Sequence, residues 1–151
     1  MTASMADGGA LGGTERLLTG AVLLHLALTL GHGLVHAAIP VRIADWQGIY
    51  SALVLFGLPL ASLPAIRTGR TRAAAALALV GGLGALPFES VAHFAVGNPD
   101  HVATVESGRA LFTATAGLSI LGDALLATAG GVALWRQTQG SAATSWSDST
   151  T

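Results

Sequence analysis

Apolar residues form four long runs along this chain, separated by short polar segments; the runs cover residues 17–38, 48–66, 73–96 and 110–135. Each run approaches or exceeds the roughly 20 residues that a helix needs to cross about 30 Å of hydrocarbon. Because backbone polar groups cannot stay unpaired in lipid, each run should be helical, and short connections should make sequential helices antiparallel. The pattern predicts an all-α protein, a four-transmembrane-helix bundle with up-down-up-down topology over residues 14–136.

Polar segments rich in small residues flank the predicted membrane domain. Residues 1–13 lack the basic stretch that opens a signal peptide. Residues 137–151 are rich in Ser, Thr and Gln. Both segments are predicted to be disordered tails.

Composition supports an integral membrane protein. Charged residues make up 10% of the chain and hydrophobic residues 52%, whereas soluble domains carry about 25% charged residues. The net charge of -1 and the scattered arginines form no basic patch, so the expected partner is the lipid bilayer and not nucleic acid. The absence of cysteine excludes disulfides and thiolate metal sites. The basic residues are all arginine, and alanine and glycine abound, which favours a prokaryotic source.

The arginines predict an orientation in the cell membrane. Arg67, Arg70 and Arg72 crowd the short loop between the second and third runs. Cytoplasmic loops carry the excess of positive charge, so this loop should be cytoplasmic. An even number of spans then places both the N and C termini in the cytoplasm. The loops at 39–47 and 97–109 should face outward.

Two of the runs carry ionisable residues at the same spacing: His32 and His36 in the first, and Glu89 and His93 in the third. Residues four apart project from one face of a helix. Ionisable groups inside lipid are costly and usually face the bundle interior, where they mark functional sites. If each run is centred in the membrane, His32 and Glu89 lie about 7 Å outward of the midplane and His36 and His93 about 13 Å. We therefore expect the first and third helices to abut and the two pairs to share one site.

A metal ion is the first candidate occupant of that site. Histidines at (i, i+4) grip one ion in the His-x-x-x-His part of zinc-protease helices, and Glu89 with His93 would add a third and a fourth ligand to His32 and His36. With no cysteine and methionine only at positions 1 and 5, the ligands are nitrogen and oxygen. This set suits a divalent transition metal, with zinc or iron the leading candidates and manganese or Cu(II) the others.

A b-type haem is the second candidate. Four-helix bundles hold haem between axial histidines on different helices, and His32 or His36 opposite His93 would supply such a pair.

Two further interpretations remain open. His25 and Asp123 lie near the midplane and, with the outer cluster, could form a proton or ion relay or part of a transporter; so small a bundle would then work as a homo-oligomer or in a larger membrane complex. Alternatively, the polar groups only fix helix packing, at about 0.6 kcal/mol per contact. The sequence identifies no catalytic residue, and whether the protein is an enzyme is left open.

Two local features complete the expectations. Asp100 and His101 lie in the outer loop, where a solvated position is favoured over a lid on the site, although His101 stays a possible accessory ligand. The fourth run carries small or polar residues at helical spacing, which should let another helix approach closely. They are Ala116, Ser119, Asp123, Ala127 and Gly130.

Overall fold

A computed structural model describes residues 12–39 and 41–148 of the chain, with side chains up to residue 139. These residues form helices and loops. The elements in chain order are α1 (Gly13–Ala38), α2 (Asp45–Tyr50), the π-helical η1 (Ser51–Gly57), α3 (Leu58–Arg67), α4 (Thr71–Ser90), the π-helical η2 (Val91–Ala95), the short 3-10 helix η3 (Val102–Thr104) and α5 (Arg109–Asp148). The predicted N-terminal tail lies outside the described residues, apart from its last two positions.

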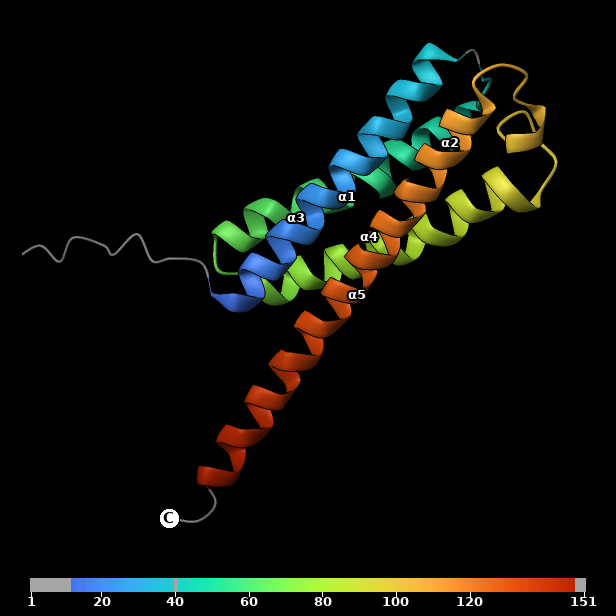
Figure 1. Cartoon of the computed structure of the whole chain (residues 1–151). Coiled ribbons are helices and arrows are strands. Elements are labelled where there is room, and N and C mark those ends of the chain that lie inside the picture. The colour runs from blue at the N-terminus through green and yellow to red at the C-terminus, as the bar shows by residue number, and fades with distance from the viewer. Residues whose placement is uncertain (1–11, 40, 149–151) are drawn as a thin grey trace, which may run out of the picture.

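Within the described part of the chain, four helical stretches are long and apolar enough to cross a membrane: Gly13–Ala38, Asp45–Arg67, Thr71–Ala95 and Arg109–Gln139. The second stretch joins α2, η1 and α3, and the third joins α4 and η2. The predicted all-helical fold with four helices of spanning length is thereby confirmed. Figure 1 shows these stretches packed lengthwise.

Short turns connect the stretches. Ile39, the residue before Pro40, is extended and ends α1, because proline disfavours helical backbone in the residue that precedes it. Between α3 and α4, Gly69 has a φ of 71°, a conformation that glycine adopts without strain. Gly108, just before α5, has a φ of 69° and packs against Ile39. The loop after α1 and the loop before α5 therefore meet at one end of the bundle.

The last helix is longer than the sequence predicts. α5 continues to Asp148, through most of the 137–151 segment that the composition predicts to be disordered. Figure 1 shows this part of α5 running past the other helices. The segment contains no proline, so no residue in it blocks the backbone hydrogen bonds of a helix.

Glycines let α4 and α5 touch backbone to backbone. A Cβ atom on Gly82 would lie 2.5 Å from the backbone nitrogen of Ala127, and one on Gly130 would lie 2.5 Å from that of Leu79. Small residues at helix contacts allow this approach where water provides no hydrophobic driving force. The predicted close packing along the Gly130 face of the fourth helix is confirmed.

The side chains divide between a small apolar core and a mixed polar interior. The core lies where α1, α3, α4 and α5 meet near the Gly69 turn. Its buried members are Leu18, Val22, Ile66, Ala74, Ala75, Ala78, Leu126 and Ala133.

The outer surface of the helices is apolar. Large aliphatic side chains are half or more exposed on each of the long stretches, among them Leu30 and Leu34 on α1, Leu53 on η1, Leu83 on α4 and Leu121 on α5. By contrast, six histidine and acidic side chains are buried: His25, His32, Glu89, His93, Asp100 and Asp123. This distribution is the reverse of that in most water-soluble proteins.

Candidate metal centre

One face of α1 points its polar residues into the bundle. His25, Thr29 and His32 are buried, with exposed fractions of 0%, 4% and 4%. His36, one turn further on, is partly buried. Their spacing of three or four residues places them on a single stripe of the helix. The predicted inward orientation is confirmed for this helix.

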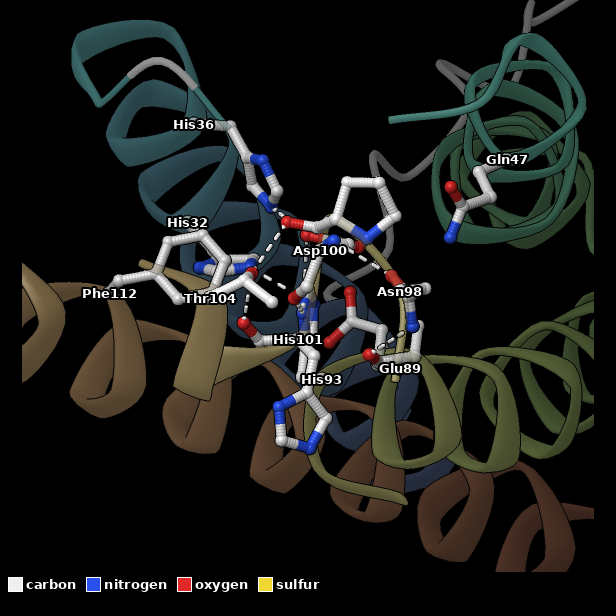
Figure 2. A network of polar contacts seen from close by, with 12 residues as sticks. His32, His36, Gln47, Glu89, His93, Asn98, Asp100, His101, Thr104 and Phe112 are labelled. Atoms are coloured by element: carbon white, nitrogen blue, oxygen red, sulfur yellow. Dashed lines mark hydrogen bonds and ion pairs between the residues drawn. The ribbon is translucent and has the colours of Figure 1, made fainter. Parts of the chain in front are cut away.

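The first and third stretches bring their histidines into contact. His93 lies on η2, and its Nε2 atom is 3.2 Å from Nε2 of His32. One ring nitrogen from each of His32, His36 and His93 lies within 4.8 Å of the others. The ring of Phe112 on α5 packs against all three imidazoles, with centroid distances between 4.9 and 5.5 Å. Figure 2 shows the three rings gathered around Asp100.

The remaining ring nitrogens of His32 and His93 have fixed partners. His93 Nδ1 donates to the backbone carbonyl of Asp100 at 3.1 Å. His32 Nδ1 is 3.0 Å from Thr115 Oγ1. The Thr115 hydroxyl itself donates to the carbonyls of Leu111 and Phe112 on its own helix, at 3.0 and 3.1 Å. Thr115 has one hydroxyl proton, and when that proton is on a carbonyl of its own helix, the oxygen can accept from His32 Nδ1–H.

These partners determine where the lone pairs point. When the Nδ1 atom of a neutral imidazole carries the proton, its Nε2 atom carries a lone pair. The Nε2 lone pairs of His32 and His93 then face each other across 3.2 Å. Two lone pairs at that distance repel unless a cation, either a proton or a metal ion, lies between them. The pair is thus arranged to hold a cation.

Asp100 belongs to the cluster, which corrects the expectation of a solvated position. Its exposed fraction is 4%, and its Oδ1 atom lies 3.3 Å from His36 Nε2 and 3.4 Å from His93 Nδ1. The side chain of Asn98 folds the loop inward: its amide donates to the Ala92 carbonyl, and its oxygen accepts from the Asp100 N–H. The Asn98–Pro99–Asp100 sequence, typical of an Asx turn, is the signal that could have identified this fold.

His101 stays outside the cluster. It is partly exposed and its Nδ1 atom accepts from the backbone N–H of Ala103, so it caps η3. Like His25, it is not one of the three described histidines whose ring nitrogens cluster, His32, His36 and His93.

Glu89 lines the same cavity but is not one of the three grouped ligands. Its Oε1 atom accepts from Ser119 Oγ at 3.1 Å, and Ser119 also contacts Thr29 at 3.3 Å. Its Oε2 atom is buried and has no hydrogen-bond partner among the described residues. Glu89 thus reaches the site as a carboxylate with one free oxygen.

A cavity of about 200 Å³ connects these groups. Gln47 and Ser51 of the second stretch and Thr29 of α1 contribute polar groups to its wall. The histidines His32, His36 and His93 and the carboxylates Glu89 and Asp100 also line it. The space suits water molecules or an ion together with its remaining ligands, because the wall offers many hydrogen-bonding partners.

A second buried ion pair lies deeper in the bundle. His25 Nδ1 is 3.0 Å from Asp123 Oδ1, and both side chains have an exposed fraction of 0%. The structure therefore brings these two predicted accessory residues together, but as a pair of their own.

Comparison of the chain with family models, with curated proteins and with solved structures found no match. The site therefore has to be interpreted from its own chemistry.

Proposed function

We propose that this chain is a multi-pass membrane protein that binds a divalent transition-metal ion, zinc or iron, through His32, His36 and His93. The contact between His32 and His93 carries the proposal. In this proposal the helices run up-down-up-down, the cluster lies toward the external face, and both termini are cytoplasmic.

The membrane part of the proposal is supported by the surface. Leucines stand exposed along the long helices, while the ionisable residues His25, His32, Glu89, His93 and Asp123 on those helices are buried. In water such a surface would promote aggregation, whereas in a bilayer it is matched to the acyl chains. The four helices are also long enough to span.

The distance between the histidine nitrogens supports metal binding. Metal–imidazole bonds of about 2.0–2.1 Å place two ligand nitrogens of a tetrahedral ion roughly 3.3 Å apart. His32 Nε2 and His93 Nε2 lie 3.2 Å apart. His36, within 4.8 Å of both, has to approach by no more than roughly 1.5 Å, a change that a side-chain rotation supplies.

Charge also favours a dication. With neutral imidazoles and both carboxyl groups ionised, Glu89 and Asp100 would give the cavity two negative charges, and both residues are buried. Buried unpaired charges are costly. An ion of charge +2 would neutralise them, and Asp100 would orient His93 in the way that outer carboxylates orient metal-binding histidines.

The same geometry disfavours haem. Two axial imidazoles on one iron need their nitrogens about 4 Å apart, twice a bond of about 2 Å, with a flat macrocycle between them. His32 and His93 are closer, and their ring centroids are 4.8 Å apart. These distances apply to the His32–His93 pair; the ring centroids of His36 and His93, the other predicted axial pair, are 5.8 Å apart.

The decisive experiment measures Zn²⁺ binding to purified protein that a chelator has stripped of metal. We expect about one ion per chain by elemental analysis and a rise in Tm, because a ligand at 100 times its Kd stabilises the fold by about 2.7 kcal/mol. The His32→Ala variant should lose at least about 100-fold in affinity, since even outer partners of metal ligands are worth about 10–100-fold. Affinity should fall on acidification because imidazole ligands must be unprotonated.

His101→Ala is the matched control, because it removes a histidine outside the cluster and should bind Zn²⁺ like the wild type. Wild-type protein that takes up no Zn²⁺ and gains no thermal stability from it would contradict the metal site. Equal losses in the His32 and His101 variants would do the same. The remaining interpretations would then be the proton relay or a purely structural polar core.

The orientation has a separate test, made simple by the absence of cysteine from the sequence. Thr68 and Ser107 are exposed in the loops at opposite ends of the bundle. In intact cells a membrane-impermeant thiol reagent should label Ser107→Cys and leave Thr68→Cys unlabelled. Permeabilised cells, in which both should react, serve as the control. Labelling of Thr68→Cys alone would invert the proposed orientation.

A further inference from the structure

His25 and Asp123 form a buried pair that the proposed metal site does not use. His25 comes from α1 and Asp123 from α5, and their side chains are fully buried. His25 is seven residues from His32, two helical turns further into the bundle.

The other ring nitrogen of His25 is committed as a donor. Its Nε2 atom lies 2.8 Å from the backbone carbonyl of Leu55. A carbonyl oxygen can only accept, so Nε2 carries a proton. Pro59, four residues after Leu55, has no N–H and cannot donate an α-helical hydrogen bond to this carbonyl. The π-helical turn η1 presents it to His25.

The contact on the opposite side of the ring then requires one more proton. If His25 were neutral, its Nδ1 atom would present a lone pair to Asp123 Oδ1 at 3.0 Å. If Asp123 were also ionised, two electron-rich atoms would face each other in a fully buried site. Either an imidazolium ion beside a carboxylate or a neutral imidazole beside a carboxylic acid removes this repulsion. Both arrangements hold one proton between the two residues.

We propose that the His25–Asp123 pair is a proton-binding site that exchanges its proton with the cavity through Glu89. In this step a proton leaves the pair and arrives at Glu89 Oε2, and the reverse step restores it. The proposal concerns the metal-free protein and does not depend on metal binding.

Glu89 is the neighbouring charged group that can serve this exchange. Its Oε1 atom accepts from Ser119 Oγ at 3.1 Å, and Ser119 lies one helical turn before Asp123 on α5. Its Oε2 atom lacks a hydrogen-bond partner among the described residues. Glu89 also lines the cavity. Of the elements around the pair, η1 contains no ionisable side chain, and Arg67 of α3 is exposed at the helix end.

Beyond the pair the buried side chains of α1 and α5 are apolar, and the buried hydroxyl of Ser62 on α3 donates to the Pro59 carbonyl at 2.6 Å. Val22 lies one turn before His25 on α1, and Leu126 lies one turn after Asp123 on α5; with Leu18 they are fully buried. These side chains offer no donor or acceptor. Ser62 has no ionisable group and its hydroxyl is already committed to a carbonyl, so the titratable neighbour of the pair is on the Glu89 side.

The protonation state of the His25–Asp123 pair is tested in the wild-type protein at pH 8.5, after a chelator has removed metal. Free histidine, with a pKa of about 6.5, is only about 1% protonated there. We expect ¹⁵N NMR of histidine-labelled protein to show both His25 nitrogens protonated, or infrared spectra to show a carboxylic acid band that disappears in Asp123→Asn. His25→Gln identifies the NMR signals. A singly protonated His25 together with an ionised Asp123 overturns the proposal.

The exchange route is tested by transfer into D₂O. Glu89→Gln should slow deuterium uptake at the pair at least about tenfold, because proton transfer by a positioned group is worth about 10²–10⁴-fold. Glu89→Asp, which keeps a carboxyl group, should restore most of the rate. Asp45→Asn, which alters an exposed carboxylate on α2, is the control. Equal rates in wild type and Glu89→Gln would overturn the role of Glu89, and the wild-type measurement above decides the protonation even if a variant fails to fold.

Discussion

Two ends of the same bundle bury opposite kinds of side chain. Toward the loops after α1 and before α5, the interior holds three clustered imidazoles, Glu89 and Asp100. Toward the Gly69 turn, it holds alanines, leucines and glycines. The apolar end shows that this chain can pack its helices without any ionisable group, using the small residues that suit helix contacts in lipid. Ionisable groups are therefore not a general requirement of helix packing in this chain, which supports the proposal that those at the other end have a function.

The same two helices, α1 and α5, contribute side chains to both ends of the bundle. α1 passes from Leu18 and Val22, through His25, to His32. α5 passes in the opposite sense from Thr115 to Leu126. The pair His25–Asp123 lies at the boundary between the two ends. Changes at one end should therefore leave the other largely intact, since distant sites contribute independently.

The largest expected effect is on stability and lies at the apolar end. Gly130→Ala would place a Cβ atom 2.5 Å from the backbone of α4, where no side chain can move aside. We expect a loss near the upper end of the range of about 1–3 kcal/mol for overpacking, measured as a lower Tm in detergent. Folded protein should still bind Zn²⁺ with wild-type affinity.

Gly131→Ala is its matched control. The nearest atom to a Cβ there is the end of the Leu79 side chain, at 3.9 Å, an ordinary contact. This variant should be as stable as the wild type, or slightly more stable because alanine favours helix over glycine by about 1 kcal/mol. If both variants unfold at the same temperature, backbone contact between α4 and α5 does not hold the apolar end together.

The sequence predicts the helices better than it predicts the long-range contacts at the polar end. Apolar runs and (i, i+4) pairs are local patterns, so they identify the helices and place His32 and His93 on inward faces. Asp100 is different, because its burial depends on Asn98 reaching back to the Ala92 carbonyl, a contact that closes only when the loop folds over η2. Likewise, nothing local to Thr115 indicates that it will accept a hydrogen bond from His32 across 83 residues.

The continuation of α5 to Asp148 is also not predicted from the sequence. Composition predicted disorder there because the segment has few residues to bury. Yet a helix that is already formed adds each further residue easily, because the costly step is nucleation. The well-packed part of α5 before residue 137 supplies that nucleus.

A smaller effect, on Zn²⁺ affinity, should measure what Asp100 of the outer loop contributes to the polar end. Asp100→Asn keeps the shape of the side chain and the backbone carbonyl that binds His93, but removes the charge that lies beside His36 and His93. Zn²⁺ affinity should fall about 10–100-fold, or about 1.4–2.7 kcal/mol, with little change in the Tm of the metal-free protein. Asp45→Asn, at an exposed carboxylate of α2, should bind Zn²⁺ as the wild type does. If Asp100→Asn instead retains full affinity, Glu89 alone would supply the negative charge that balances the metal ion. The outer loop would then shield the metal centre from solvent without contributing to its electrostatics.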